Sequence, residues 1–265
     1  MSIEFNLIDL TERSAKFVLS GLVPASANAF RRFMINEVPR MTIDEVNFYE
    51  NTSVLFDEQL ALRLGLIPLR ADPTLYVMES ECTCEGGCTL CQSSVTITAE
   101  GPRMVRSSDL LIGDENISVA DDGIPIVDLK EGQKLLVSAI IKLGIGEQHA
   151  KWQNAVVCGY KNVPHVSITE QCTDCGACVA VCPREIFKCV EGHVMIGDDL
   201  NCSCCNLCVE ACEVDGVIIE EDPGAFLFTL ETDGGVTASA TILYAVHMLR
   251  DKAVKLKSVL EALDH

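Results

Sequence analysis

Basic residues are scarce in this sequence. Lysine and arginine total 20 against 39 aspartates and glutamates, so the 265-residue chain carries a formal charge of −19. A negatively charged surface repels phosphate backbones, which argues against direct binding of DNA or RNA by the chain as a whole. No run of lysines and arginines interrupts the acidic surplus, and we therefore expect little direct contact with DNA.

Long apolar runs and targeting segments are also lacking. The longest uninterrupted apolar stretches, such as Ile242 to Val246, are too short to span a bilayer, so we expect no membrane contact. Residues 1–5 do not form a basic region followed by an apolar one, and no signal peptide is indicated. We expect an intracellular protein, located in the cytoplasm.

Familiar catalytic motifs are missing as well. The sequence contains no phosphate-binding G-x-x-x-x-G-K-[ST], no nucleophile elbow G-x-S-x-G and no zinc-binding H-E-x-x-H. We therefore predict no catalytic residue in this chain.

Cysteine, in contrast, is abundant and clustered. Of the 15 cysteines, four lie within residues 82–91 and ten within residues 172–212, and only Cys158 stands alone. Clustered cysteines in an intracellular chain bind metal more often than they form a disulfide framework. The two blocks are therefore candidate metal sites, whereas Cys158 is expected to be a small buried apolar residue.

The larger block contains two runs that resemble bacterial-type ferredoxins. Residues 172–183 read C-x2-C-x2-C-x3-C-P, and residues 202–212 repeat C-x2-C-x2-C-x3-C. Three cysteines at this spacing wrap one cubane, and the fourth reaches the other cluster. Zinc is the competing metal, but zinc sites seldom use two interleaved runs of this kind. The predicted ligands are Cys172, Cys175, Cys178 and Cys212 for a first cluster site, and Cys182, Cys202, Cys205 and Cys208 for a second cluster site.

The two cluster sites differ in one residue. Cys182 is followed by Pro183, as in bacterial-type ferredoxins, but Cys212 is followed by Glu213. The second cluster site is therefore expected to be the more consistently filled one. The number of clusters, one or two, and their type, 4Fe-4S or 3Fe-4S, stay open. We expect structural clusters, and the alternative is a redox switch in which loss of the cluster unfolds the insert and hinders assembly. The spare thiols of this block are Cys189 and Cys204, for which the alternatives are additional ligands, a disulfide and plain thiols.

The smaller block is a compact loop that reads C-x-C-x3-C-x2-C, with Gly86 and Gly87 at the expected hairpin tip. Four thiolates within ten residues can close a tetrahedral zinc site that leaves no position for a substrate, and such a site is structural. One or two disulfides are the alternative, and the ligand spacing favours zinc. The candidate ligands are Cys82, Cys84, Cys88 and Cys91.

Hydrophobic periodicity predicts a mixed α+β fold. The acidic segment 168–222 holds twelve acidic and two basic residues, which indicates a separate insert. Strands are expected on both sides of a polar turn at 9–14, and around 43–48, 94–98 and 225–231. Helices are expected over 25–38, from Asp57 to about Gly65, and over the last thirty residues. The second of them has an apolar face and carries Leu60, Leu62, Leu64 and Leu66.

The last helix carries a narrow apolar seam with heptad-like spacing. A helix that covers its own sheet is one interpretation, and a helix that packs on a partner helix is the other. The length and narrowness of the seam favour the partner helix. Its residues are Ile242, Val246, Leu249, Ala253, Leu256, Leu260 and Leu263.

Residues 28–69 carry a longer signature. It reads N-A-F-R-R-F-M-I-N-E-V-P at 28–39, N-T-S-V-L-F-D-E at 51–58 and L-R-L-G-L-I-P-L at 62–69, and G-I-G-E-Q-H-A-K-W follows at 144–152. These segments resemble the assembly subunit of multisubunit RNA polymerases, a family that comprises the D-type polymerase subunit of archaea, the bacterial α N-terminal domain and the third-largest subunit of eukaryotic polymerase II. The cysteine loop has the spacing of the zinc loop in the eukaryotic relatives, and many archaeal members carry a ferredoxin-like insert.

The resemblance implies three domains: an α-subunit-like dimerisation domain of residues 1–45 and 224–265, an inserted β-rich domain of 46–166 with the cysteine loop 82–91, and a ferredoxin-like iron–sulfur domain of 167–223. It implies a non-catalytic assembly subunit of DNA-directed RNA polymerase, a nucleotidyltransferase complex that performs transcription. The implied partners are a smaller α-like subunit, the L-type polymerase subunit of archaea, in a heterodimer, then the second-largest catalytic subunit and other small polymerase subunits.

Two further expectations concern function. Arg31, Arg32 and the charges of the helix at 58–63 are expected to contact the large subunits. The alternative for Arg31 and Arg32 is a pair of solvated surface arginines. The alternative function is an iron–sulfur electron-transfer subunit of an oxidoreductase. Residues 28–69 disfavour it, because an electron carrier needs no such segment.

Overall fold

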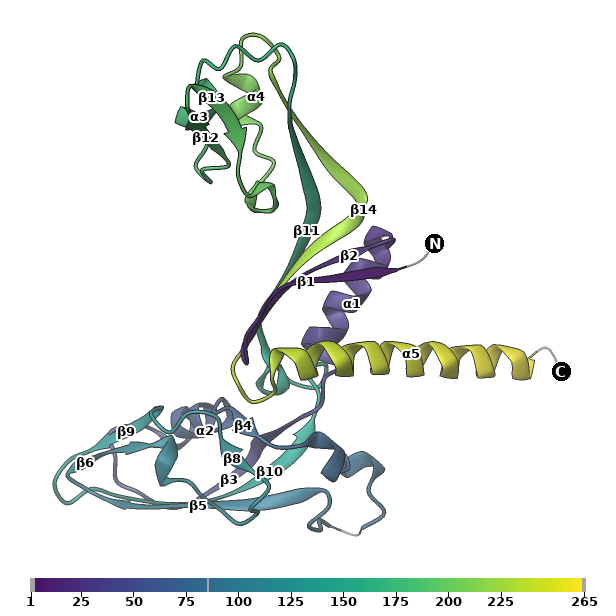
Figure 1. Ribbon diagram of the computed structural model, residues 1–265. Coiled ribbons are helices and arrows are strands. Elements are labelled where there is room, and N and C mark those ends of the chain that lie inside the picture. The colour runs from purple at the N-terminus through teal and green to yellow at the C-terminus, as the bar shows by residue number, and fades with distance from the viewer. Residues whose placement is uncertain (1–2, 85, 264–265) are drawn as a thin grey trace. The chain divides into compact units, whose positions relative to one another are not determined.

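A computed structural model describes residues 3–84 and 86–263, and it has the α+β composition that the sequence predicts (Figure 1). The strands are β1 (Glu4–Leu10), β2 (Ser14–Ser20), β3 (Arg40–Asn51), β4 (Leu69–Arg70), β5 (Gln92–Glu100), β6 (Arg103–Arg106), β7 (Leu111–Ile112), β8 (Ser118–Val119), β9 (Pro125–Leu129), β10 (Lys134–Gly144), β11 (Ala155–Ile168), β12 (Phe187–Val190), β13 (His193–Ile196) and β14 (Val217–Thr232). The helices are α1 (Pro24–Asn36), α2 (Asp57–Gly65), α3 (Ala177–Val181), α4 (Leu207–Glu210) and α5 (Ala238–Leu263), and the short 3-10 helices include η2 (Glu79–Glu81) and η5 (Asp199–Asn201).

The chain divides into two compact units, each built from separate stretches of sequence. The first unit combines Met1–Ile8, Lys16–Asn28 and Gly159–Thr229. The second unit combines Asp9–Ala15, Ala29–Cys158 and Leu230–His265. Both units therefore contain residues from early and late parts of the chain.

The first unit contains most of a four-stranded sheet with the strand order β1-β2-β14-β11. Strand β2 alternates buried and half-buried residues, the pattern of a strand with one face in a core. Its Phe17 is fully buried and stacks on Phe228 of β14 with ring centroids 5.2 Å apart, and Tyr160 of β11 packs on the same ring. Aromatic side chains thus form the centre of this sheet.

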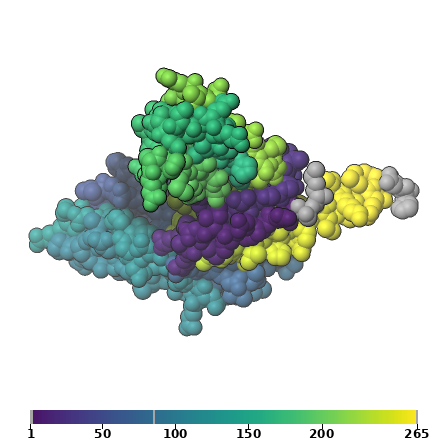
Figure 2. Space-filling view, turned by 45° about the horizontal axis from the view of Figure 1, so that its top comes forward, coloured from purple at the N-terminus to yellow at the C-terminus, as the bar shows by residue number. Residues whose placement is uncertain are grey.

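The cysteine-rich segment also belongs to the first unit. Strand β11 leads into it and β14 leads out of it (Figure 1). It contains α3, α4 and the antiparallel hairpin of β12 and β13, in which Phe187 pairs with Ile196. In the space-filling view its green residues lie beside purple residues of the N-terminal strands (Figure 2), and Lys16 of β2 contacts Asn201.

The second unit is organised around the sheet β3-β10-β5-β7. Strand β10 is antiparallel to both β3 and β5 and pairs with each over almost its whole length. Its inward residues pack with α2 and the neighbouring strands into a large apolar core, in which Leu60, Leu64, Ile97 and Ile141 are at most 1 % exposed.

Most expected elements are present, and the structure adds detail to two of them. Strand β14 runs through Pro223 and Gly224, where we expected a break before the strand. Pro223 has no N–H group that needs a partner, and the next residue pairs with the neighbouring segment, since the Gly224 carbonyl accepts from the amides of Gly21 and Leu22. A strand can therefore continue across these two residues.

The second point concerns α2, which was expected to have an apolar face and to carry four leucines. The structure buries Leu60 and Leu64 but leaves Leu62 61 % and Leu66 55 % exposed. A spacing of two residues turns a helix by about 200°, so neighbours of that kind cannot face the same core. No helix among the described residues has both the length and the apolar character needed to cross a membrane.

Candidate metal centres

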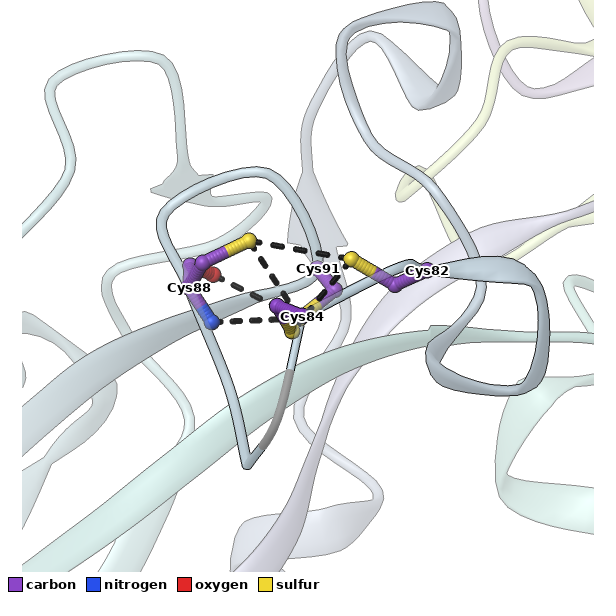
Figure 3. Close-up of side chains that lie close together, drawn as sticks. All are labelled: Cys82, Cys84, Cys88 and Cys91. Atoms are coloured by element: carbon purple, nitrogen blue, oxygen red, sulfur yellow. Dashed lines mark hydrogen bonds between the residues drawn. The ribbon is translucent and has the colours of Figure 1, made fainter.

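The four-cysteine loop connects η2 to β5, and its thiols point toward one another (Figure 3). All four sulfur atoms lie within 4.8 Å of one another. Four of the Sγ–Sγ distances, those of the pairs 82–84, 82–88, 84–91 and 88–91, are between 3.4 and 3.8 Å. Four sulfurs at a Zn–S distance of about 2.3 Å from a tetrahedral ion are about 3.8 Å apart. The donor set therefore has the size of a closed Zn–S4 site.

The disulfides that the sequence left open are not formed. The four cysteines of the loop are free thiols, and the sulfur distances of at least 3.4 Å far exceed the roughly 2.05 Å of an S–S bond. Backbone amides also point at the sulfurs, since the Cys88 amide donates to Cys91 Sγ at 3.3 Å. A hydrogen bond from the Leu90 amide lowers the pKa of Cys88 to about 7, whereas burial and hydrogen bonds with the neighbouring thiols raise the pKa of Cys82 and Cys91. Without a metal, the loop therefore favours the thiolate at Cys88.

Local backbone geometry explains how ten residues can close this loop. Gly87 has a φ of +105° and follows Gly86 with +108°, values that residues with a side chain rarely adopt. At the base of the loop the Val77 amide donates to the Leu90 carbonyl at 2.8 Å. The predicted glycine tip is thus the turn that returns the chain toward β5.

Lys142 of β10 anchors the loop, a role that sequence reasoning missed. Its ammonium donates to Glu45 Oε1 at 2.7 Å and to Glu79 Oε2 at 2.9 Å, and Glu79 belongs to η2 just before Cys82. Hydrogen bonds from Glu45 and Glu79 raise the pKa of Lys142 above its usual range. A lysine inside the apolar run of β10 is the signal that could have revealed a buried ion pair.

The ferredoxin-like segment is an internal repeat at the level of backbone conformation. Each ligand cysteine of the first run has a counterpart 30 positions later in the second. Residues with a positive φ, the left-handed backbone conformation, also recur 30 positions apart. Residues with a side chain rarely adopt this conformation, so its repetition shows that both halves have the same local fold. The pairs are Asp174 with Cys204, Gly176 with Asn206 and Glu185 with Asp215.

Backbone amides in both halves are aimed at cysteine sulfurs. Asp174 N lies 3.5 Å from Cys172 Sγ, and Cys204 N lies 3.4 Å from Cys202 Sγ. At the last cysteine of each run, Ile186 N donates to Cys182 Sγ at 3.5 Å and Gly216 N donates to Cys212 Sγ at 3.1 Å. Amide donors to thiolate sulfur are a known means of stabilising iron–sulfur clusters, so both runs fit such a group.

The structure also shows which cysteines of the two runs lie near one another. Cys182 of the first run lines one small cavity together with Cys202, Cys205 and Cys208 of the second. On the other side, Gly216 approaches both Cys172 and Cys212 so closely that an added Cβ would lie 3.4 Å from Cys172 Cβ and 3.3 Å from Cys212 Sγ. Each run therefore places its last cysteine beside the opposite run.

The remaining cysteines occupy different surroundings. Cys189 is exposed on β12 and Cys204 is half-buried, with burial raising the pKa of its thiol to about 11. Cys158 was expected to be buried but is half-buried, with its Sγ 3.9 Å from the Arg31 carbonyl oxygen. The reason is its place in β11, whose neighbours Val156 and Val157 are also exposed.

The fold and the two cysteine systems together define an α+β protein with a ferredoxin-like cysteine segment. Comparison with known proteins gives the family. Residues 46–158 match the RNA polymerase Rpb3/RpoA insert domain, and residues 165–188 match the 4Fe-4S binding domain.

Relatives similar over the full length carry one name, DNA-directed RNA polymerase subunit Rpo3. The subunit of Methanosarcina mazei is 46 % identical over 99 % of this chain and 100 % of its own length. That of Methanosarcina acetivorans is 44 % identical with the same coverage, and that of Archaeoglobus fulgidus is 38 % identical over 97 % of this chain and 98 % of its own length. The chain belongs to the Rpo3 family of DNA-directed RNA polymerase subunits.

Proposed function

We propose that this chain is a non-catalytic assembly subunit of a DNA-directed RNA polymerase and acts in transcription, in the cytoplasm. The observation that carries the proposal is similarity along the whole chain to relatives named Rpo3. The match of residues 46–158 to the Rpb3/RpoA insert domain supports it separately. An electron-transfer subunit would account for the cysteines of 172–212 but leaves that match unexplained.

The proposed dimerisation domain consists of residues 1–45 and 224–265, and its partner is a smaller α-like polymerase subunit, the L-type subunit of archaea. Helix α5 supports this assignment. Its first turns bury Ala238, Thr241 and Ala245, but every described residue from 251 to 263 is exposed. The buried residues lie beside the seam, whose own first members Ile242 and Leu249 are half-buried and Val246 is exposed, so the chain itself covers only the first turns of α5.

Helix α5 is held at its start by the buried hydrogen bond from Asn154 Nδ2 to Thr241 Oγ1, 2.6 Å long, and farther along by one lysine. Lys252 Nζ lies 2.6 Å from Glu37 Oε1 and 5.4 Å from the ring centroid of Phe33. The helix is thereby tied to the end of α1, and its apolar seam continues beyond that contact with Leu256 61 % and Leu260 53 % exposed. A contiguous apolar stripe in water marks a protein contact, and its heptad-like spacing suits a second helix.

The second-largest catalytic subunit is the proposed partner of the inserted domain, assigned to residues 46–166, and other small subunits join the same assembly. The exposed apolar side chains of Phe56, Leu62 and Leu66 gather at α2 and support this contact. Arg63 is exposed although its guanidinium also donates to the Ile126 carbonyl at 2.8 Å, and Glu58 is exposed at the start of the helix. The charges of α2 therefore stay part of the proposed contact, together with its exposed apolar residues.

The metal groups are proposed to be structural. One or two clusters of the 4Fe-4S or 3Fe-4S type would occupy the ferredoxin-like domain, assigned to residues 167–223. Zinc would occupy the four-cysteine loop. The proposed ligands are Cys172, Cys175, Cys178 and Cys212 in the first cluster site, Cys182, Cys202, Cys205 and Cys208 in the second cluster site, and Cys82, Cys84, Cys88 and Cys91 for zinc.

Capture of partners by the tagged full chain tests the proposed function. Polymerase subunits in the captured material support it, whereas a flavin- or molybdenum-containing enzyme in their place would favour the electron-transfer function. The seam is tested by the double variant Leu256→Asp with Leu260→Asp, which would bury two unpaired charges at a helix–helix contact and is expected to abolish binding of the small partner.

The matched control places the same two charges elsewhere on α5, at the exposed positions Ser258 and Ala262. The Ser258→Asp, Ala262→Asp variant is expected to bind the small partner as the unchanged chain does. Normal binding by the Leu256→Asp, Leu260→Asp variant would show that the seam is not the interface.

A further inference from the structure

Two lysines of the sheet in the first unit reach into the ferredoxin-like segment. Lys16 of β2 donates to Asn201 Oδ1 at 3.1 Å. Lys161 of β11 donates to the carbonyl oxygens of Leu200 and Cys202, each at 2.6 Å. All three acceptors belong to η5 or to the residue that follows it. Both lysines therefore bind the turn that immediately precedes Cys202.

These contacts are tertiary and bring charge from outside the segment. Lys161 and Cys202 are 41 positions apart, and Lys16 and Asn201 are 185 positions apart. Within residues 168–222 the basic residues are Arg184 and Lys188, against twelve acidic residues. In so negative a segment, ammonium groups supplied by the sheet have a large electrostatic effect on their neighbours.

The corresponding turn of the first run is held differently. Thirty positions before η5, the residues that precede Cys172 are fixed by the Thr169 hydroxyl, which donates to the Asp215 carbonyl at 3.1 Å. The Cys172 amide closes the same turn by donating to the Thr169 carbonyl at 3.1 Å. The turn before Cys172 is thus held by the neutral hydroxyl of Thr169, whereas the turn before Cys202 is held by the ammonium groups of Lys16 and Lys161.

We propose that Lys161, assisted by Lys16, is a positioning residue for the second cluster site: it fixes Cys202 and favours the reduced state of the cluster bound there. The inference rests on the proposed ligand set of that site. Cys202 is buried, and its backbone is held at its own carbonyl and at that of Leu200, so the direction of its Cα–Cβ bond is fixed.

The electrostatic part follows from the charge of the cluster. A cluster gains one negative charge when it is reduced, and a nearby cation stabilises the more negative state. The cluster next to the two lysines is therefore expected to have a higher reduction potential than the cluster next to Thr169.

The test compares Lys161→Met with Lys188→Met in the full chain, purified without oxygen. Lys188 is exposed on β12 of the same segment, so its replacement removes the same charge without touching η5. We expect Lys161→Met to release iron to a chelator several-fold faster and to lower the midpoint potential of one cluster in a titration followed by EPR. Lys188→Met is expected to leave the rate of iron release and the midpoint potential near those of the unchanged chain.

Two more variants separate charge from packing. Lys161→Arg keeps the charge and is expected to restore the midpoint potential. Lys16→Met removes the hydrogen bond to Asn201 and is expected to lower the midpoint potential by less than Lys161→Met does. This second variant keeps the test valid if Lys161→Met does not fold. An unchanged midpoint potential in both methionine variants, or an equal shift in Lys188→Met, overturns the proposal.

The ligand set itself is tested separately in the same preparation. If Cys205→Ser retains all the iron of the unchanged chain, the proposed second cluster site is wrong, independently of the results for the lysine variants. If Cys205→Ser loses the iron of one cluster but the midpoint potential is unchanged in both Lys161→Met and Lys16→Met, only the positioning role of Lys161 is wrong.

Discussion

The β-rich sheet of the second unit and the cysteine segment of the first unit are built on different physical principles. The core around β3, β5 and β10 consists of many aliphatic side chains from strands that pair along most of their length. The core of the cysteine segment is small, and its buried members include Cys178, Cys202 and Cys208. Where sulfur takes the place of carbon in a core, metal–sulfur bonds have to supply much of the folding free energy.

The two regions also differ in how their charged residues are paired. The cysteine segment carries a surplus of ten acidic residues, whose mutual repulsion opposes a compact fold. The β-rich region instead pairs its partly buried charges, as Lys142 does with Glu45 and Glu79. The first region should therefore depend on its metal, and the second should depend on its apolar packing.

Loss of a cluster ligand is expected to have the largest effect. Cys205→Ser should lose the iron of one cluster and open residues 168–222 to protease, while residues 46–158 stay resistant. Metal ligation contributes on the order of 10 kcal/mol to small metal-dependent domains, so the segment should unfold rather than loosen. Iron analysis and limited proteolysis of the same sample measure both effects.

Cys189→Ser is the control for this variant, because Cys189 is also an exposed thiol of the segment but belongs to neither predicted ligand set. It should keep its iron and its protease resistance. A segment that remains resistant after its iron is removed would contradict the dependence on metal.

An intermediate effect is expected in the apolar core. Leu64→Ala removes a fully buried side chain from α2 and should destabilise the second unit by about 2–5 kcal/mol without loss of iron. Leu62→Ala, on the exposed side of the same helix, should change the free energy of unfolding by less than about 0.5 kcal/mol. Denaturant unfolding measures both values.

The same pair tests the proposed contact with the second-largest subunit. Leu62→Ala should weaken capture of that subunit although the variant is as stable as the unchanged chain. Equal destabilisation by the two alanine variants would show that the burial difference between Leu62 and Leu64 is wrong.

The smallest effect is expected at the four-cysteine loop. Cys88→Ser should reduce zinc from about one ion per chain to none, because a closed tetrahedral site needs all four thiolates. The loosening should stay within the loop, since Lys142 still ties Glu79 to β10. Cys158→Ser is the matched control and should keep its zinc. Metal analysis that finds zinc retained in Cys88→Ser would contradict the assignment.

The sequence predicted much of this architecture because the relevant signals are local. The alternation in residues 14–20, the acidic start of α2 at Asp57 and the glycine pair at the tip of the cysteine loop all depend on near neighbours. The cysteine spacing was informative for the same reason, since three ligands of a cluster lie on one short loop. The proposed ligand sets themselves stay predictions.

What the sequence could not show depends on distant residues. Nothing near Lys161 indicates that its ammonium meets a carbonyl 41 positions later, and nothing near Lys142 names Glu79 as its partner. The pairing of β14 just after Pro223 likewise involves a distant residue, because the Gly224 carbonyl accepts from the amide of Gly21. Burial of Leu64 and exposure of Leu62 follow from the direction in which α2 is docked.

The position of β14 in its sheet has a consequence for synthesis on the ribosome. Strand β14 lies between β2 and β11, and it is translated only after the whole cysteine segment. The nascent chain must therefore hold β1, β2 and β11 without their central neighbour until residue 232 has emerged. All the proposed iron ligands, the last of which is Cys212, are consequently translated before the strand that completes this sheet.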